Sequence, residues 1–177
     1  MQIHLDTKPY GVLEGDALVT YIFDENEPIQ GRALELDKLA GGLLARLAKS
    51  GEIAGKSLET TLLHAPAGLK VARLLVVGAG KREQFNPATL RKVTGAALRY
   101  LKSRGVHRVV FLVRGNDATP EAVQAVTEAA IVADFETDKY KTEKKNDKFI
   151  ETFTIAGFAP TEKAAAEAAI VRGRAIG

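Results

Sequence analysis

The chain alternates short apolar runs with longer segments in which apolar residues recur every three or four positions. The short runs are rich in β-branched and aromatic residues and are bounded by turn-forming residues, a pattern typical of β-strands. The sequence therefore predicts strands at residues 17–23, 57–65, 73–77, 107–113 and 149–155. The run at 107–113 is almost continuously apolar, as expected of a strand covered on both faces.

The first long segment has the period of an amphipathic helix. Between residues 36 and 47, apolar side chains recur at i, i+3, i+4, i+7, i+8 and i+11. Gly51 follows as a helix stop signal. The pattern predicts one continuous helix in spite of Gly41 and Gly42, whose presence indicates close packing against a neighbouring backbone.

Three further helices are predicted from start signals and apolar stripes. Asn86 is a suitable cap with Pro87 at the first helical position, and that helix is expected to end near Gly105. A second is expected from about residue 120 to 135, and an alanine-rich one from residue 161 almost to the end. Strands that alternate with helices predict an α/β fold: a three-layer sandwich with a mixed, mostly parallel sheet between helices.

Composition bounds the classes of protein that fit. A chain of 177 residues with 46% hydrophobic content suits one globular core that buries about 70% of its unfolded surface. The absence of cysteine excludes disulfides, thiolate metal sites and a cysteine nucleophile. No window resembles a secretion signal or a membrane span, so a cytoplasmic location is favoured. The net charge of +3 is spread along the chain and does not by itself indicate a nucleic-acid partner.

The stretch RLLVVGAGKREQFNP leads an apolar run into two glycines and a lysine, as phosphate-binding loops do. A P-loop requires serine or threonine after the lysine, but Arg82 follows Lys81. The dinucleotide fingerprint requires a third glycine where Glu83 stands. Both phosphate motifs therefore fail, and we interpret Gly78 and Gly80 as parts of a strand-to-helix turn. The alternative is an altered phosphate site that uses the nearby positive charge.

The residues themselves identify no catalytic, metal-binding or cofactor-binding side chain. His4, His64 and His107 lie far apart and lack the i, i+4 spacing that places two imidazoles on one helix face. The sequence has no G-x-S-x-G motif, and its acidic pairs fall in turn-like segments. We expect the three histidines to be structural or surface residues.

A charged connector at residues 136–148 is the remaining candidate for an interaction. Its basic and aromatic residues are Lys139, Tyr140, Lys141, Lys144, Lys145 and Lys148. Lysines around an aromatic ring are typical of nucleic-acid contacts. Four acidic residues are interleaved with the five lysines, however, and leave a net charge of +1. A solvated, mobile loop is the other interpretation.

The order of these motifs resembles that of a known family. LAGGLLARLAKSGEIAGKSLETTLLHAPAGLKVARLLVVGAGKREQFNPATLRKVTGAALRYL is similar to the N-terminal domain of leucyl (cytosol) aminopeptidases. The similarity continues through EAAIVADFETDKYKTEKKND, and AEAAIVRGRAIG resembles the helix that leads to the family's catalytic domain. The chain departs from the family at Phe135 and Thr137, where tyrosine and phenylalanine are more usual.

The resemblance implies a macro-domain-like α/β domain at residues 1–160, followed at 161–177 by a linker helix to a catalytic domain absent from this chain. It implies a metal-dependent leucyl aminopeptidase as the parent, with two divalent metals, zinc or manganese, in the catalytic domain. The family's segments for metal binding and catalysis match nothing here, so the chain itself is expected to be non-catalytic.

The function implied first is assembly or regulation, in which the domain packs against its own catalytic domain and helps to join trimers into hexamers. Two alternatives remain: DNA binding in the oligomeric parent, and binding of ADP-ribose or another nucleotide, as in other macro-like domains. The last helix lacks a clear cap. We therefore expect exposed apolar surface near Ala168, Ala169 and Ile170.

Overall fold

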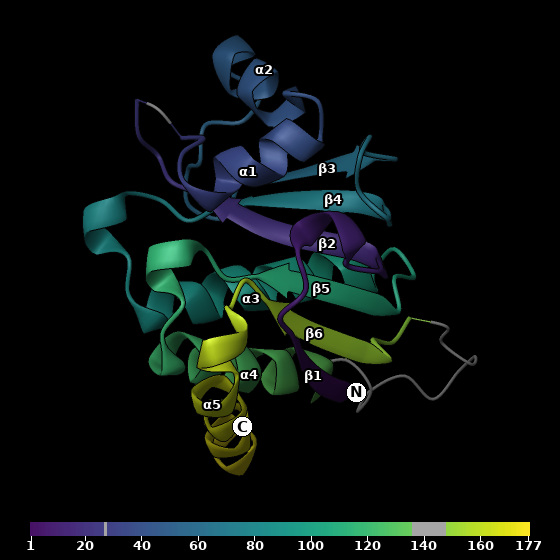
Figure 1. Ribbon diagram of the computed structural model, residues 1–177, viewed down its shortest axis with the longest axis vertical. Coiled ribbons are helices and arrows are strands. Elements are labelled where there is room, and N and C mark those ends of the chain that lie inside the picture. The colour runs from purple at the N-terminus through teal and green to yellow at the C-terminus, as the bar shows by residue number, and fades with distance from the viewer. Residues whose placement is uncertain (27, 136–147) are drawn as a thin grey trace.

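The computed structural model describes residues 1–26, 28–135 and 148–177 and shows one sheet between two layers of helices (Figure 1). The six strands of the sheet are β1 Gln2–Asp6, β2 Gly15–Ile22, β3 Thr60–His64, β4 Val71–Gly78, β5 Arg108–Leu112 and β6 Thr152–Ala156. Their order across the sheet is β1-β6-β5-β2-β4-β3. Neighbouring strands are parallel except for β3, which is antiparallel to β4. The predicted α/β sandwich with a mostly parallel sheet is confirmed.

Five α-helices cover the sheet in the described part of the chain. They are α1 Arg32–Leu39, α2 Leu43–Ser50, α3 Pro87–Lys102, α4 Pro120–Phe135 and α5 Lys163–Ile176. Short 3-10 turns lie at Tyr10–Val12, Arg82–Gln84, Gly115–Asp117 and Pro160–Glu162. No helix of the described residues is long and apolar enough to cross a membrane.

The side chains of β2 divide the interior into two cores. Val19 and Tyr21 point into the core beneath α3, α4 and α5, whereas Leu18 and Ile22 point into the core beneath α1 and α2. This alternation follows from the two-residue repeat of a strand. Strand β2 lies at the centre of the three-layer arrangement and is therefore buried on both faces.

The start of α3 follows its sequence signals. Asn86 has an extended backbone, and its side-chain oxygen accepts a hydrogen bond from the amide of Thr89 at 3.0 Å. Pro87 occupies the first helical position, where no amide donor is needed. The predicted cap is confirmed. It could be predicted because capping depends on residues that are neighbours in the sequence.

The single helix predicted over residues 36–47 is wrong. Gly41 and Gly42 have positive φ angles of 67° and 73°, which separate α1 from α2. The buried Asp37 carboxylate then accepts the amides of Leu44 and Ala45 at 2.6 and 3.3 Å, at the start of α2. Apolar spacing extends across the break because both helices turn the same face to the sheet.

Strand β1 was not predicted from the sequence, and it forms an edge of the sheet. It pairs in parallel with β6, with Gln2 opposite Thr152 and Asp6 opposite Ala156. Only Ile3 is buried in this strand. A five-residue segment with one buried side chain has too little pattern to identify, and its pairing depends on residues about 150 positions away.

The last helix packs against the domain more closely than expected. Ala169 and Ile170 are buried in the same core as α3 and α4, so the apolar surface expected near them consists of the exposed Ala168 and Val171 instead. Gly173 lies so close to Thr127 of α4 that a side chain at this position would clash. The large apolar residues that α5 exposes are Val171 and Ile176.

Candidate functional site

The chain leaves β2 and β5 toward opposite faces of the sheet, at their carboxyl ends. It runs from β2 to α1 on one face and from β5 to α4 on the other. In open α/β sheets, ligands bind where neighbouring connections diverge in this way. A cavity of about 540 Å³ lies here, which we call the carboxyl-edge cleft. Its lining residues are Phe23, Glu25, Gln30, Gly31, Arg32, Glu35, Arg82, Arg114, Gly115, Asn116 and Asp117.

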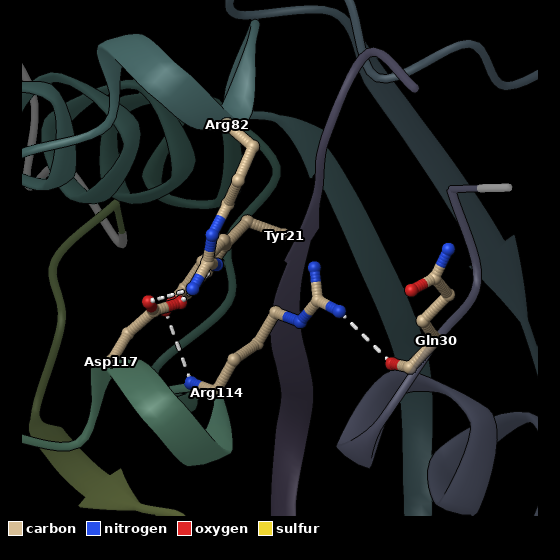
Figure 2. A network of polar contacts seen from close by, with 5 residues as sticks. All are labelled: Tyr21, Gln30, Arg82, Arg114 and Asp117. Atoms are coloured by element: carbon tan, nitrogen blue, oxygen red, sulfur yellow. Dashed lines mark hydrogen bonds and ion pairs between the residues drawn. The ribbon is translucent and has the colours of Figure 1, made fainter. Parts of the chain in front are cut away.

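Asp117 joins residues from three strand ends (Figure 2). Its carboxylate accepts the hydroxyl of Tyr21 at 3.0 Å and the Arg82 guanidinium at 3.0 and 3.2 Å. The Tyr21 hydroxyl in turn accepts the amide of Arg114 at 3.1 Å. Burial raises the pKa of the Tyr21 phenol well above its ordinary value, and the Asp117 charge acts in the same direction. Tyr21 therefore stays protonated and ties the connection after β5 to strand β2.

Two guanidinium groups lie against one aromatic ring in the carboxyl-edge cleft. The central carbon of Arg82 is 4.6 Å from the centre of the Phe23 ring, and that of Arg114 is 5.0 Å away. Figure 2 shows that the Arg82 side chain points toward Asp117, whereas the Arg114 side chain points toward Gln30. Contact with an aromatic face stabilises a guanidinium and limits its motion. The ring thus positions two positive charges in the cleft.

Arg114 has an unfilled hydrogen-bonding position. Its Nη2 donates to the backbone oxygen of Gln30 at 2.9 Å, but its Nη1 is buried and has no partner among the residues that the structure describes. Burial lowers the pKa of the Arg114 guanidinium from its ordinary value, while Tyr21 and Asp117 act in the opposite direction. A buried donor without an acceptor is uncommon and destabilising. Arg114 is therefore the residue of the cleft that most needs a ligand or an ordered water.

Arg32 connects α1 to the loop after β6. Its Nη1 donates to the backbone oxygen of Gly157 and, at 3.4 Å, to the hydroxyl of Tyr10. Burial raises the pKa of the Tyr10 phenol, while the hydrogen bond from Arg32 lowers it. Because these contacts tie three segments together, the Arg32 guanidinium has a structural role at the margin of the cleft.

Two exposed carboxylates also line the carboxyl-edge cleft. Glu25 follows β2, and Glu35 lies in the first turn of α1. Within the described ranges, neither side-chain carboxylate forms a hydrogen bond or an ion pair. The lining holds three arginines and three acidic residues, so its formal charges balance. The cleft therefore offers unpaired groups of both signs.

The glycine-containing loop at residues 78–81 has the geometry of a turn. The amide of Gly80 donates to the oxygen of Gly55 at 2.9 Å, and the amide of Ala79 donates to the oxygen of Ile22 at 2.8 Å. Gly80 has a φ of 74°, which explains why glycine stands there. Because these amides are already used within the chain, the loop resembles a connector more than a phosphate cradle.

The three histidines lie apart, as their sequence positions indicate. His4 is in edge strand β1 and His64 ends the opposite edge strand β3, while the Nδ1 of His107 is 2.8 Å from the oxygen of Phe149. In residues 1–26, 28–135 and 148–177, no three His, Asp or Glu side chains come together as a metal site would require.

Of the residues named for the predicted interaction loop, the structure describes Lys148. Lys148 is exposed just before β6. The remaining residues named for that loop lie outside the described residues; they are Lys139, Tyr140, Lys141, Lys144 and Lys145. The interaction loop stays a prediction.

Sequence reasoning missed the carboxyl-edge cleft as a site. The polar segment at residues 114–117 directly follows the buried run of β5, and the segment at 24–26 directly follows β2. Carboxyl ends of parallel strands lie at the same edge of a sheet, so polar clusters after two buried strands are a usable signal. What the sequence lacked was the strand order that makes β2 and β5 neighbours.

Comparison with known proteins identifies the family. Residues 19–144 match the model of the cytosol aminopeptidase family, N-terminal domain. A relative from Solibacter usitatus (strain Ellin6076), named probable cytosol aminopeptidase, is 35% identical over 99% of this chain and 33% of its own length. The chain therefore spans about a third of the length of this curated relative.

Solved structures show the same fold at low sequence identity. A tomato leucine aminopeptidase variant is similar with a TM-score of 0.71 and 20% identity, over 96% of this chain and 35% of that one. A Trypanosoma brucei macrodomain in complex with ADP-ribose gives a TM-score of 0.65 at 20% identity, over 99% of this chain and 69% of that one. The expected macro-domain-like architecture is confirmed.

Proposed function

The chain belongs to the cytosol aminopeptidase family, and we propose that it is a non-catalytic assembly and regulatory domain of a leucyl aminopeptidase. The observation that carries the proposal is the alignment itself. Nearly the whole chain corresponds to a third of an aminopeptidase relative, and the matching family model is that of the N-terminal domain.

We assign peptide hydrolysis to the part of the relatives that this chain does not match. Hydrolysis with two metal ions requires several ligands to converge on each ion and a position left open for water or substrate. In this proposal the two divalent metals, zinc or manganese, are bound by the separate catalytic domain. The names of the relatives support a cytosolic location for the parent.

The proposed partners are the catalytic domain and other copies of the parent, up to a hexamer. Helix α5 supports this role because it is anchored in the core while exposing Val171 and Ile176, each 67% exposed. Val132 of α4 and Ile176 line one shallow hollow beside α3. An exposed apolar surface on rigid helices is typical of an interface. We propose that α5 connects to the catalytic domain.

The alternatives are DNA binding and nucleotide binding. DNA binding would require a basic groove, and this chain has nearly balanced charge, so symmetry-related copies would have to supply one. Nucleotide binding is favoured by the likeness to a macrodomain with ADP-ribose. It is disfavoured by the acidic residues of the carboxyl-edge cleft. Both therefore rank below assembly.

The non-catalytic assignment is tested by incubating the purified chain with a leucyl amide substrate and added zinc or manganese. We expect no release of leucine. Turnover that a chelator removes, and that persists after repurification away from host peptidases, would overturn the assignment.

The assembly role is tested by sedimentation over a range of concentrations, with and without DNA or ADP-ribose. We expect the average mass to rise with concentration and to be unchanged by either ligand. A mass that stays monomeric at all concentrations, together with salt-sensitive retention of DNA, would favour the first alternative instead.

A further inference from the structure

We propose that the carboxyl-edge cleft binds a small zwitterion, a free α-amino acid or a short peptide, with the carboxylate at Arg114 and the ammonium at Glu25 and Glu35. Binding itself requires no catalytic activity from this chain. Its regulatory meaning rests on the proposed function, because free amino acids are what an aminopeptidase releases.

The carboxylate subsite follows from the unfilled position on Arg114. The side chain is held by its bond to Gln30 and by the Phe23 ring, and its backbone amide is held by Tyr21. Its Nη1 is buried and unpaired within the described chain. The residue as a whole is only partly buried, and the proposal requires a rotation of its guanidinium that turns this N–H toward the cleft. A guanidinium suits a carboxylate in both charge and geometry.

The ammonium subsite follows from the two exposed glutamates. Glu25 and Glu35 line the same cavity as Arg114, and neither has an ionic partner among residues 1–26, 28–135 and 148–177. The charge of Glu25 acts on Arg114, which indicates that the two groups lie within electrostatic reach. A small zwitterion carries an ammonium and a carboxylate in one molecule, so it offers a charge partner to Arg114 and to the glutamates together.

The balance of charge selects a zwitterion over a nucleotide. Arg82 is already paired with Asp117, and Arg32 is bonded to backbone and phenol oxygens. A diphosphate would therefore find one incompletely paired arginine to bind its negative charges. The two unpaired carboxylates would repel those charges. The cavity of about 540 Å³ falls in the usual size range of small-ligand sites.

The binding test is calorimetry on this chain with L-leucine, leucylglycine, leucinamide, N-acetylleucine, inorganic phosphate and ADP-ribose. We expect saturable binding of leucine or leucylglycine. Leucinamide lacks the carboxylate and N-acetylleucine lacks the ammonium, so each should bind about tenfold more weakly or worse. Equal affinity for the blocked compounds, tighter binding of phosphate or ADP-ribose, or no binding of leucine and leucylglycine would overturn the proposal.

The residues are tested with charge-removing variants of similar shape. Arg114→Gln and Glu35→Gln should each weaken leucine binding by about tenfold. Arg172→Gln and Glu151→Gln are matched controls on exposed sites outside the cleft and should leave affinity unchanged. Thermal unfolding of each variant identifies loss of the fold. Unchanged affinity in folded Arg114→Gln, or equal weakening in the controls, would contradict the assignment. Peptide hydrolysis is not measured, so failure here is distinct from failure of the proposed function.

Discussion

The two ends of the central strands carry charged clusters of opposite character. At the amino ends of β2 and β5, Asp16 and Arg108 form a closed pair. At the carboxyl ends of the same strands, Asp117 and Arg114 belong to the open cluster of the carboxyl-edge cleft. Both clusters hold the same two strands together, but only one has hydrogen-bonding capacity left over.

The amino-end pair is complete in its hydrogen bonds. The Arg108 side chain donates to one Asp16 oxygen at 2.9 and 3.1 Å, and the amides of His107 and Arg108 donate to the other at 3.1 and 2.8 Å. Burial acts to raise the pKa of Asp16, but these hydrogen bonds outweigh it, so the pKa is lowered. A carboxylate whose acceptor positions are filled in this way stabilises the fold and has little left to bind.

The hydrogen bonds of the carboxyl-end cluster are incomplete, which leaves a donor available to a ligand. Tyr21, Asp117 and Arg82 satisfy one another, whereas the neighbouring Arg114 keeps a buried donor unpaired. Strained or unsatisfied groups concentrate at functional sites, where stability is sacrificed for binding. Unused hydrogen-bonding capacity, more than charge itself, therefore separates a binding cluster from a structural one.

The largest effect is expected from Asp117→Ala. This variant leaves the buried Tyr21 hydroxyl and the Arg82 guanidinium without their acceptor, so the free energy of unfolding should fall by about 3 kcal/mol. Urea denaturation measures the change. The matched change at the amino ends, Asp16→Ala, should destabilise the chain less because the Asp16 carboxylate is 26% exposed, whereas that of Asp117 is 7% exposed. Equal losses would show that the two clusters do not differ in this way.

Removing the Tyr21 hydroxyl tests how much hydrogen bonding, without a change of charge, contributes to stability at the carboxyl ends. Tyr21→Phe keeps the packed ring but removes the donor to Asp117 and the acceptor for the Arg114 amide, so stability should fall by about 1.5 kcal/mol. Tyr100→Phe is the control, since the Tyr100 hydroxyl forms no hydrogen bond within the described chain. Denaturation curves that coincide for the two variants would argue against the bridging role of Tyr21.

The amino-end pair should respond to pH. Because the folded-state pKa of Asp16 lies below its ordinary value, its contribution to stability is present above about pH 4 and is lost as pH falls through the folded pKa. The stability difference between the native chain and Asp16→Asn should therefore shrink below about pH 4. Denaturation across a pH series measures this difference. A difference that stays constant down to strongly acidic pH would refute the assignment.

The smallest effect on stability is expected from Arg114→Met. The variant keeps an apolar stem and removes a buried, unpaired donor, but it also removes the hydrogen bond from Nη2 to the exposed Gln30. Because these two effects oppose each other, the free energy of unfolding should stay within about 0.5 kcal/mol of the native value. Arg82→Met, which removes an ion pair to Asp117, should be more destabilising. Thermal unfolding of both variants decides the order. The reverse order would show that Arg114 is a structural residue.

Local patterns in the sequence determined most of the elements. The cap at Asn86 and the apolar stripe that follows it determined α3, and the continuous run at 107–113 determined a strand buried on both faces. These features succeed because caps and periodicity involve residues within a few positions of one another. The alternation of strands and helices was enough to give the layered architecture, and the order of motifs was enough to indicate the family.

The tertiary structure alone decided where the elements meet. It broke the predicted helix at Gly41 and Gly42, because the buried Asp37 starts a new helix there. It also paired β1 with β6 from the other end of the chain. Apolar periodicity records which face of an element is buried, but it does not record whether the backbone bends or which strand is the neighbour.

The carboxyl-edge cleft depends on tertiary structure for the same reason. Glu25, Arg82 and Arg114 belong to three separate loops, and none of these loops carries a motif that would identify it as part of a site. They meet because β2 lies between β4 and β5 and their parallel strands end at one edge. The sequence by itself determined the strands and their polar ends, whereas the order of the strands decided which of those ends share a cavity.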